Sequence, residues 1–308
     1  MKQKQRLTIF LIVITLFAAA VGWAWSVWVR VHDNPPPPVD YVPPDDIVEP
    51  EPDKNITNIL LLGVDQIGNE PGRADSIIVM SINEDTDEVA LISIPRDSRV
   101  EIPGHGMDKI NHAMAYKGQI SLMKSTVETL LGVKIDHYVY TNFTGFTRIV
   151  DILGGVTVNV ERPMVHEAVY SPSINLSPGE QRLSGEQALG YVRFRGDAQR
   201  DFGRMERQQK FLKALANEVL QAKTVLKLPQ LLEETARHLR TDMTIPELLD
   251  FARRANSINM DEVTAVVLPG RNVNINGIAY VDLDKDVLAE TIRRYLRWEE
   301  DNSTNANK

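Results

Sequence analysis

An uncharged apolar stretch near the N-terminus constrains this chain more than any other feature. Residues Leu7 to Val29 read LTIFLIVITLFAAAVGWAWSVWV, without a single charged side chain. A helix of this length is long enough to cross the hydrocarbon core of a bilayer. The run therefore predicts one membrane-spanning helix at 7–29, and the rest of the chain must then fold on one side of the membrane.

The residues that flank this stretch predict its orientation. Three basic residues precede it: Lys2, Lys4 and Arg6. Three tryptophans gather at its far end: Trp23, Trp25 and Trp28. Positive charge favours the cytoplasmic side and indole rings favour the interface. We expect residues 1–6 in the cytoplasm and a single-pass protein of a cell membrane with its main domain outside the cytoplasm. The alternative is a cleaved signal peptide, but the apolar run continues past its weak cleavage site at Ala18–Ala20.

Residues 30–54 predict an extended spacer. Four consecutive prolines occupy Pro35–Pro38, and further prolines interspersed with acidic residues follow up to Pro52. Such a composition cannot build a core and favours polyproline II conformation. It would hold the following domain a short distance from the membrane.

Charge and cysteine content exclude several function classes. The formal net charge is −8, which argues against a general nucleic-acid binder. The absence of cysteine excludes disulfides, thiolate metal sites and a cysteine nucleophile. The sequence contains neither a Gly-x-Ser-x-Gly elbow nor a phosphate-binding Walker loop.

Apolar periodicity from Asn55 onward predicts an α/β domain at 55–298, followed by a polar tail at 299–308. The expected strands are Ile56–Leu62, Ser76–Asn83, Glu88–Pro95, Val133–Phe143, Val156–Val160 and Asp261–Leu268. The expected helices are Gln119–Leu131, Thr144–Leu153, Phe202–Ala222, Leu228–Leu239, Ile245–Ser257 and Asp286–Trp298. Alternation of the two predicts a layered α/β/α domain, and the acidic turn between the second and third strands indicates a hairpin and hence a mixed central sheet.

A short arginine-rich run is the clearest candidate for an anion-binding site. Within 191–209 the chain carries Arg193, Arg195, Arg200, Arg204 and Arg207, with Asp197 and Asp201 among them. Guanidinium groups bind phosphate oxygens in pairs of hydrogen bonds. Arg193 and Arg195 would point the same way on an extended or turn segment, and a helix starting near Asp201 would place the later arginines on or near one face. The competing interpretation is a solvated helix start with Arg–Asp ion pairs.

Further charged residues follow the first strands. They are Asp65 after the first strand, Arg73 and Asp75 before the second, and Arg96 and Asp97 after the third. Ligands gather at strand ends in α/β sheets. Two carboxylates on neighbouring loops are able to hold Mg²⁺, and adjacent arginines neutralise phosphate charge that the metal leaves exposed.

Four motifs together resemble the LytR-CpsA-Psr (LCP) family of bacterial cell-envelope phosphotransferases. They are Gly72-Arg-Ala-Asp-Ser76, Ser93-Ile-Pro-Arg-Asp97, Asp108-Lys-Ile-Asn-His-Ala113, and Tyr191-Val-Arg-Phe-Arg195 with Asp201-Phe-Gly-Arg-Met-Glu-Arg-Gln-Gln209. The resemblance covers roughly residues 55–226 and implies that 55–298 is an extracytoplasmic catalytic domain. It implies transfer of an anionic glycopolymer, such as teichoic acid or capsule, from a polyprenyl-pyrophosphate carrier to peptidoglycan through a phosphodiester.

The resemblance also implies roles for individual residues. Asp65 and Asp75 would hold Mg²⁺, with Mn²⁺ as the alternative ion. The pyrophosphate would be bound by Arg73, Arg96, Arg193, Arg195, Arg204 and Gln208. The catalytic residues would be Asp75, Arg96 and Asp97, with Asp75 or Asp97 orienting or deprotonating the attacking sugar hydroxyl. His112, inside the third motif, is interpreted as structural.

Two other functions use the same residues. The arginines would also serve a non-catalytic receptor for polyprenyl phosphate or glycopolymer, or a lipid pyrophosphatase in which water replaces the sugar hydroxyl. The lipid needs an apolar slot, for which the helical segments 122–131, 146–153 and 211–220 are candidates, although most of their apolar residues are expected to be core. The sequence after Ile245 predicts no function.

Overall fold

The computed structural model describes residues 55–65, 72–117, 119–166, 174–196, 201–219 and 239–299, the last range without 245, 249–250, 252–253 and 255–257. The apolar run 7–29, the linker 30–54 and the expected helix at 228–239, apart from Leu239, lie outside these ranges. Within the described residues, no helix is long and apolar enough to cross a membrane.

A six-stranded mixed sheet forms the centre of the domain. Its order is β11-β6-β1-β2-β3-β12. The strands are β1 (Ile56–Val64), β2 (Ala74–Asn83), β3 (Glu88–Ser93), β6 (His137–Asn142), β11 (Leu239–Thr241) and β12 (Thr264–Val267). β1 pairs antiparallel with β2 and parallel with β6, while β3 pairs antiparallel with β2 and parallel with β12. The expected mixed sheet is therefore confirmed.

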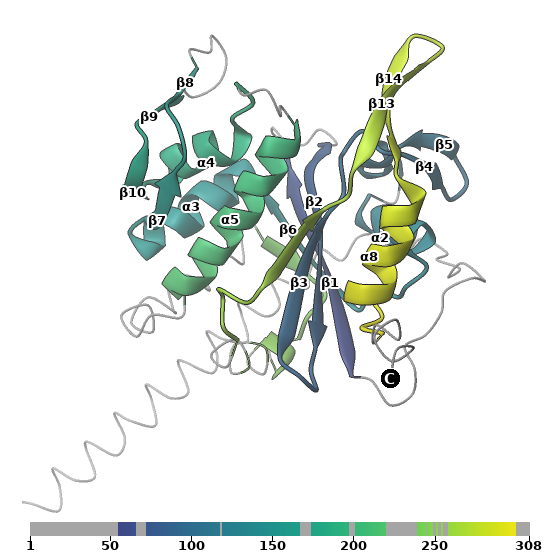
Figure 1. The fold of residues 1–308 in the computed structure, drawn as a ribbon, viewed down its shortest axis with the longest axis horizontal. Helices are drawn as coiled ribbons and strands as arrows, with labels where there is room; N and C mark the ends of the chain where they lie inside the picture. Colours follow the sequence, from purple (N-terminus) through teal and green to yellow (C-terminus); the bar gives the residue numbers. More distant parts are fainter. Residues whose placement is uncertain are drawn as a thin grey trace, which may run out of the picture.

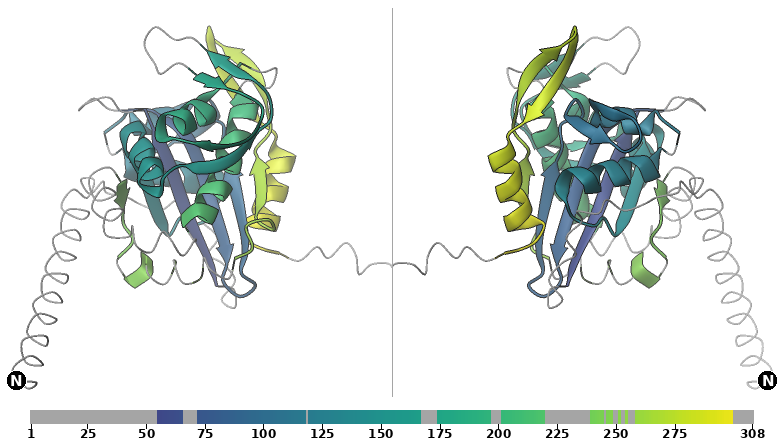
Figure 2. Two further views of the ribbon diagram at one scale, coloured as in Figure 1. Left: turned by 90° about the vertical axis from the view of Figure 1, so that its left-hand side faces the viewer. Right: turned by 90° about the vertical axis from the view of Figure 1, so that its right-hand side faces the viewer.

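Helices cover both faces of this sheet, as Figures 1 and 2 show. α2 (Ile120–Leu131) and α8 (Lys285–Tyr295) lie on one face, and α3 (Phe143–Leu153), α4 (Gly185–Arg193) and α5 (Asp201–Val219) lie on the other. Strand periodicity explains the arrangement, because successive side chains point to opposite faces. Leu60 and Leu62 join the core beneath α2 and α8, whereas Ile59 belongs to the separate core on the other face.

Four small two-stranded sheets surround the central one. They are β4 (Arg99–Ile102) with β5 (Gly106–Lys109), β7 (Val156–Val160) with β10 (Gly179–Leu183), β8 (Met164–His166) with β9 (Ile174–Leu176), and β13 (Gly270–Ile275) with β14 (Ile278–Leu283). The 3-10 helix η1 (Ile110–Met114) follows β5. The β13–β14 hairpin projects beyond the sheet in Figure 1.

One edge of the central sheet collects the loops that carry the sequence motifs. Val64, at the end of β1, pairs with Asn142 at the end of β6 and with Ala74 at the start of β2. Ser93, at the end of β3, pairs with Val267 at the end of β12. β2 is antiparallel to both β1 and β3, so these ends share one edge. The loop after β3, the start of β2 and the hairpin after β12 all emerge there.

Element boundaries differ from the expected ones at a few places. The strand expected at 133–143 is shorter and forms β6, because Val133 and Ile135 enter the core as coil. Arg193 does not lie on an extended segment, since it is the last residue of α4, a helix that periodicity did not predict. Where residues are described within 245–257, they are helical at 246–248, 251 and 254.

Local chemistry explains why α4 forms in spite of its two glycines. Ser184 caps the helix and makes a capping box with Gln187. Gly185 lies against α3, where a Cβ atom would come within 2.3 Å of the Thr147 carbonyl oxygen. The missing side chain therefore permits the close packing of α3 and α4.

Candidate active site

A cavity of about 780 Å³ lies between the sheet and helices α3, α4 and α5. Most of its wall is apolar and includes Leu61, Val139, Phe146, Leu189, Phe211 and Leu215. We call this the first cavity. Of the helical segments expected to line an apolar slot, those in α3 and α5 contribute to it, whereas the apolar side chains of α2 belong to the core on the other face.

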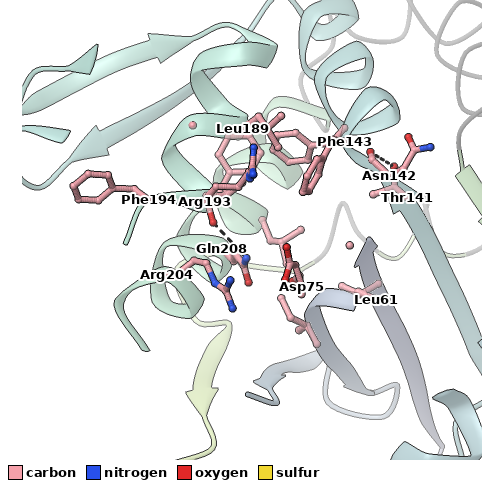
Figure 3. A pocket seen from close by; sticks show the side chains of 18 of the residues that line it. Leu61, Asp75, Thr141, Asn142, Phe143, Leu189, Arg193, Phe194, Arg204 and Gln208 are labelled. Atoms are coloured by element: carbon pink, nitrogen blue, oxygen red, sulfur yellow. Dashed lines mark hydrogen bonds between the residues drawn. The ribbon is translucent and has the colours of Figure 1, made fainter. Parts of the chain in front are cut away.

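Charged side chains lie together on the wall of the first cavity. They are Asp75, Arg96, Arg193, Arg195 and Arg204, accompanied by Gln208. In Figure 3, Arg193 comes from α4, Arg204 and Gln208 come from α5, and Asp75 faces them from β2. Six residues from three distant parts of the sequence therefore meet around one space. We call Arg96, Arg193, Arg195 and Arg204 the arginine cluster.

Arg96 contacts three carboxylates of the site. Its Nη1 donates a short hydrogen bond to Asp75, and its Nε lies 3.5 Å from Asp97 Oδ2 and 3.8 Å from Asp201 Oδ2. Burial opposes the positive charge, but the carboxylates of Asp75, Asp201 and Asp97 outweigh burial and raise the pKa of Arg96. Arg96 is therefore a fixed cation.

Arg204 is almost fully buried, with its side chain 3% exposed. Burial is the main reason that its pKa falls to about 10, and the charges of Arg195 and Arg96 act in the same direction, against Asp201 and Asp75. Arg204 remains a cation at neutral pH, in a place where positive charge is under-compensated. An added anion would relieve this imbalance.

Three polar atoms at this point are buried without a hydrogen bond among the described residues. They are Nε of Arg96, Nε of Arg204 and Oε1 of Gln208. Buried polar atoms normally find a partner, and a bound anion would supply one for the two arginine Nε–H groups. All three come from residues that line the first cavity.

Arg195 and Arg193 complete the cluster. Arg195 Nε lies 3.0 Å from Asp201 Oδ1. The Arg193 guanidinium lies 4.6 Å from the centroid of the Phe143 ring, a distance at which a cation interacts with an aromatic face. Aromatic stacking leaves the edge of a guanidinium free for oxygen ligands.

Asp97 does not line the first cavity. It lines a second cavity, of about 800 Å³, together with Lys109 and Asp201. Lys109 Nζ donates to Asp97 Oδ1 at 2.8 Å. Burial alone would raise the pKa of Asp97, but the hydrogen bond from Lys109 and the charge of Arg96 dominate and lower it, so the carboxylate is ionised at neutral pH.

Asp65 and Arg73 line neither cavity. The Arg73 backbone N–H donates to Asp65 Oδ1 at 2.8 Å, and the Arg73 side chain is exposed. Asp65 follows Val64, whose partner across the β1–β2 pair is Ala74, so Asp65 and Asp75 lie at the same end of these strands.

The oxygen ligands near the first cavity are few for a metal ion. Within the described residues, no group of three or more acidic or histidine side chains is placed to hold a metal ion. Asp75 and Asp65 supply two carboxylates at one end of the β1–β2 pair. Mg²⁺ commonly keeps several waters and takes one or two carboxylates beside phosphate oxygens. The residues therefore fit an ion held mainly by water and by a phosphate ligand.

Two residues of the sequence motifs have structural roles. Arg207 is buried, donates to the Phe194 carbonyl oxygen at 2.6 Å and lies 3.7 Å from Glu161. His112 lies 2.9 Å through Nδ1 from Asp108, which also accepts from Tyr116. These contacts agree with the structural interpretation of His112. Arg200 lies outside the described residues.

Several residues that line the second cavity have no role predicted from the sequence. Lys109 was visible within the Asp108–Ala113 motif, and Asp201 within the arginine-rich run. Asn272 and Tyr280 come from the β13–β14 hairpin. The signal that would have found this hairpin is Asn276-Gly277 between two isoleucines, since Asn-Gly favours a two-residue hairpin turn.

The geometry defines a class of protein. An apolar cavity with a cluster of arginines on its wall suits an amphiphile whose head group is anionic. Along both cavities, five cationic side chains accompany three carboxylates, which leaves an excess of positive charge. The fold and site are those of an α/β domain whose cavity suits an amphiphile with an anionic head group.

Comparison with known proteins identifies the family. The LytR_cpsA_psr family model matches residues 39–295. The chain is 36% identical over 238 residues to polyisoprenyl-teichoic acid–peptidoglycan teichoic acid transferase TagU of Oceanobacillus iheyensis, covering 74% of this chain and 71% of the relative. It is 30% identical over 302 residues to TagU of Bacillus subtilis, covering 94% and 95%. The crystal structure of B. subtilis TagV superposes with a TM-score of 0.69 at 27% identity, covering 80% of this chain and 99% of TagV. The chain belongs to the LytR-CpsA-Psr family.

Proposed function

We propose that this protein transfers an anionic, teichoic acid-like glycopolymer from a polyprenyl-diphosphate carrier to peptidoglycan. The observation that supports this most directly is the joining of an apolar cavity to the arginine cluster on its wall. A carrier lipid needs both halves, because its tail is insoluble in water and its diphosphate is charged. The names of the two TagU relatives describe the same reaction.

The residues of the first cavity divide into two roles. The apolar walls from β1, β6, α3, α4 and α5 receive the prenyl chain, whose burial is favourable at roughly 25 cal/mol per Å². Arg96, Arg193 and Arg195 bind the diphosphate oxygens, and the buried Arg204 supplies an Nε–H donor that makes no hydrogen bond within the described residues, with Gln208 beside it on the cavity wall. Phosphoryl transfer needs such positioning and charge neutralisation more than covalent help.

Mg²⁺ belongs to this proposal as the second source of positive charge. Asp75, with Asp65 beside it, would hold the ion, which would neutralise diphosphate oxygens and stabilise the departing phosphate. Asp75 also accepts the hydrogen bond from Arg96, which orients that guanidinium toward the same space. Mn²⁺ is expected to replace Mg²⁺, because both favour oxygen ligands.

The proposed location follows from the N-terminal sequence. Residues 7–29 anchor the protein in the cell membrane, residues 1–6 stay in the cytoplasm, and the linker 30–54 keeps the catalytic domain close to the outer surface. A short spacer allows a carrier lipid to enter the first cavity while part of its tail remains in the bilayer.

The test uses full-length protein in detergent or vesicles, a lipid-linked polymer as donor and peptidoglycan oligomers as acceptor. Arg193→Ala should lower transfer by about 100-fold, the cost of removing one cation from a developing negative charge. The control is Arg148→Ala, on the exposed side of α3, which should change transfer less than twofold. Chelation should abolish transfer and Mg²⁺ should restore it.

The assay also separates the rival functions. Release of lipid phosphate without polymer attached to peptidoglycan would identify a pyrophosphatase. Donor binding without turnover in the presence of Mg²⁺ would identify a receptor. Near wild-type transfer by the Arg193→Ala protein would contradict the role of the arginine cluster.

A further inference from the structure

The second cavity differs from the first in its chemistry. It lies between the loop after β3, the end of β5, the start of α5 and the β13–β14 hairpin. Its lining combines charged and polar side chains, among them Lys109, Asp97, Asp201 and Asn272, with the aromatic side chains of Phe202 and Tyr280. A polar space with aromatic surfaces suits a sugar, which offers hydroxyl and amide groups together with apolar ring faces.

The hairpin is tied to the site through backbone and side-chain contacts. The Val281 N–H donates to the Asp97 carbonyl oxygen at 2.8 Å, and Ser98 forms an isolated bridge with Val281. Lys109 Nζ, which holds Asp97, lies 5.8 Å from the centroid of the Tyr280 ring. The hairpin is therefore a fixed wall of the second cavity, next to the loop that carries Arg96 and Asp97.

The two cavities meet at three arginines. Arg96, Arg195 and Arg204 line both of them. A diphosphate bound by these residues with its lipid in the first cavity would have its other side toward the second. In phosphoryl transfer the attacking and departing oxygens lie roughly in line on opposite sides of the phosphorus. A second substrate in the second cavity would be placed on the attacking side.

We propose that the second cavity binds the acceptor, an N-acetylated amino-sugar strand of peptidoglycan, and that the β13–β14 hairpin selects it. This inference rests on the proposed function. The side-chain amide of Asn272 is placed to pair with acetamido or hydroxyl groups, and Lys109 and Arg195 attract the carboxylates of peptide stems. The β13–β14 hairpin, in the part of the chain for which the sequence predicted no function, would then recognise the acceptor.

The proposed reaction moves the polymer phosphate from the lipid phosphate to the acceptor hydroxyl. The acceptor hydroxyl oxygen forms a bond to the phosphorus that carries the polymer, and the bond from this phosphorus to the bridging oxygen breaks. The bridging oxygen leaves with the lipid as polyprenyl monophosphate. The hydroxyl proton passes to Asp97 and then to water. Asp97 can accept this proton in spite of its lowered pKa, because the hydroxyl becomes strongly acidic as its bond to phosphorus forms.

Direct binding of the acceptor tests the inference without relying on turnover. Titration calorimetry of the full chain with a soluble disaccharide-peptide fragment of peptidoglycan gives the acceptor Kd, and titration with polyprenyl diphosphate gives the donor Kd. Asn272→Trp fills the second cavity from an exposed strand position and should raise the acceptor Kd at least tenfold, with the donor Kd unchanged. Asn159→Trp, at an exposed position of β7 outside both cavities, is the matched control and should leave the acceptor Kd unchanged.

Asn272→Ala guards against a folding defect caused by the large side chain, and it should weaken acceptor binding by about threefold to tenfold, the value of one hydrogen bond. Wild-type acceptor affinity in both Asn272 variants would overturn the inference, as would an equal loss of donor and acceptor binding. Failure of the wild-type protein to transfer polymer, with acceptor binding still lost in Asn272→Trp, would reject the proposed function and leave the acceptor site in place.

Discussion

Replacing the adjacent glutamines Gln208 and Gln209 by methionine should separate a site residue from a structural one. Gln209 is 3% exposed, and its Nε2 lies 2.8 Å from the Val266 carbonyl oxygen, 2.9 Å from Ser93 Oγ and 3.2 Å from the Leu91 carbonyl oxygen. These contacts join α5 to β3 and β12. Gln208 Nε2 makes one long hydrogen bond, 3.3 Å to the Val192 carbonyl oxygen, and its Oε1 makes none within the described residues.

The expected magnitudes follow from these contacts. An amide nitrogen has two hydrogens, so Gln209 makes two full hydrogen bonds, and methionine of similar length would leave their buried acceptors unpaired at a cost of about 2–3 kcal/mol. For a domain of this size the melting temperature should fall by about 5–10 °C. Gln208→Met removes an unsatisfied polar group, so its stability should stay within about 0.5 kcal/mol of wild type.

The activities of the same two variants should show the opposite pattern. Gln208→Met should lower polymer transfer by about 10-fold to 100-fold, because the amide faces the diphosphate, whereas Gln209→Met should keep near-normal transfer well below its melting temperature. Thermal unfolding by circular dichroism and the transfer assay together give the result. Equal melting temperatures for the two variants would refute the assignment of Gln209 to the structure and Gln208 to the site.

Three further predictions concern the charged groups and the first cavity. Arg96→Lys should fold but lose about 100-fold in transfer, because one ammonium cannot replace a guanidinium that faces three carboxylates; a loss below threefold would contradict this. Asp97 has a pKa below that of an unfolded aspartate, so its contribution to stability is present above about pH 4 and disappears as the pH falls through the lower, folded value. Urea unfolding should therefore show Asp97→Asn less stable than wild type at neutral pH, with the difference shrinking as the pH falls below the pKa of an unfolded aspartate, and a difference independent of pH would argue against the ion pairs. Ile149→Trp, inside the first cavity, should weaken binding of a long prenyl diphosphate at least tenfold and leave inorganic pyrophosphate binding unchanged, and weakening of both would show that the cavity does not hold the lipid.

The sequence predicted the central strands well because their apolar runs are short and bounded by turns. The strands expected at 56–62, 76–83 and 88–95 appear as β1, β2 and β3 with ends shifted by two residues at most. Helix α4 was missed, because Gly185 and Gly190 weaken its periodicity and its capping box is the main local signal. The β13–β14 hairpin was missed because its strands are largely exposed and carry no alternating apolar pattern.

The candidate site was predictable where it depends on strand ends. Asp75 and Arg96 meet because the start of β2 and the end of β3 share one sheet edge, a consequence of antiparallel pairing. The fates of the other arginines depend on tertiary contacts that no local pattern encodes. Arg207 can be buried because its guanidinium donates a hydrogen bond to the Phe194 carbonyl oxygen and forms an ion pair with Glu161, a residue far away in the sequence. Arg73 lines neither cavity, although its motif is among the clearest in the sequence.

The attachment of the β13–β14 hairpin has an evolutionary consequence. The backbone bond from Val281 to Asp97 and the bridge at Ser98 join main chain to main chain. Such joints tolerate almost any side chain at the positions between them. Mutations at exposed hairpin positions such as Asn272 would therefore alter what the second cavity recognises and leave the arginine cluster, which comes from other elements, unchanged. A bacterium whose wall polymer changes would then need substitutions in the β13–β14 hairpin alone, and the rest of the domain could stay as it is.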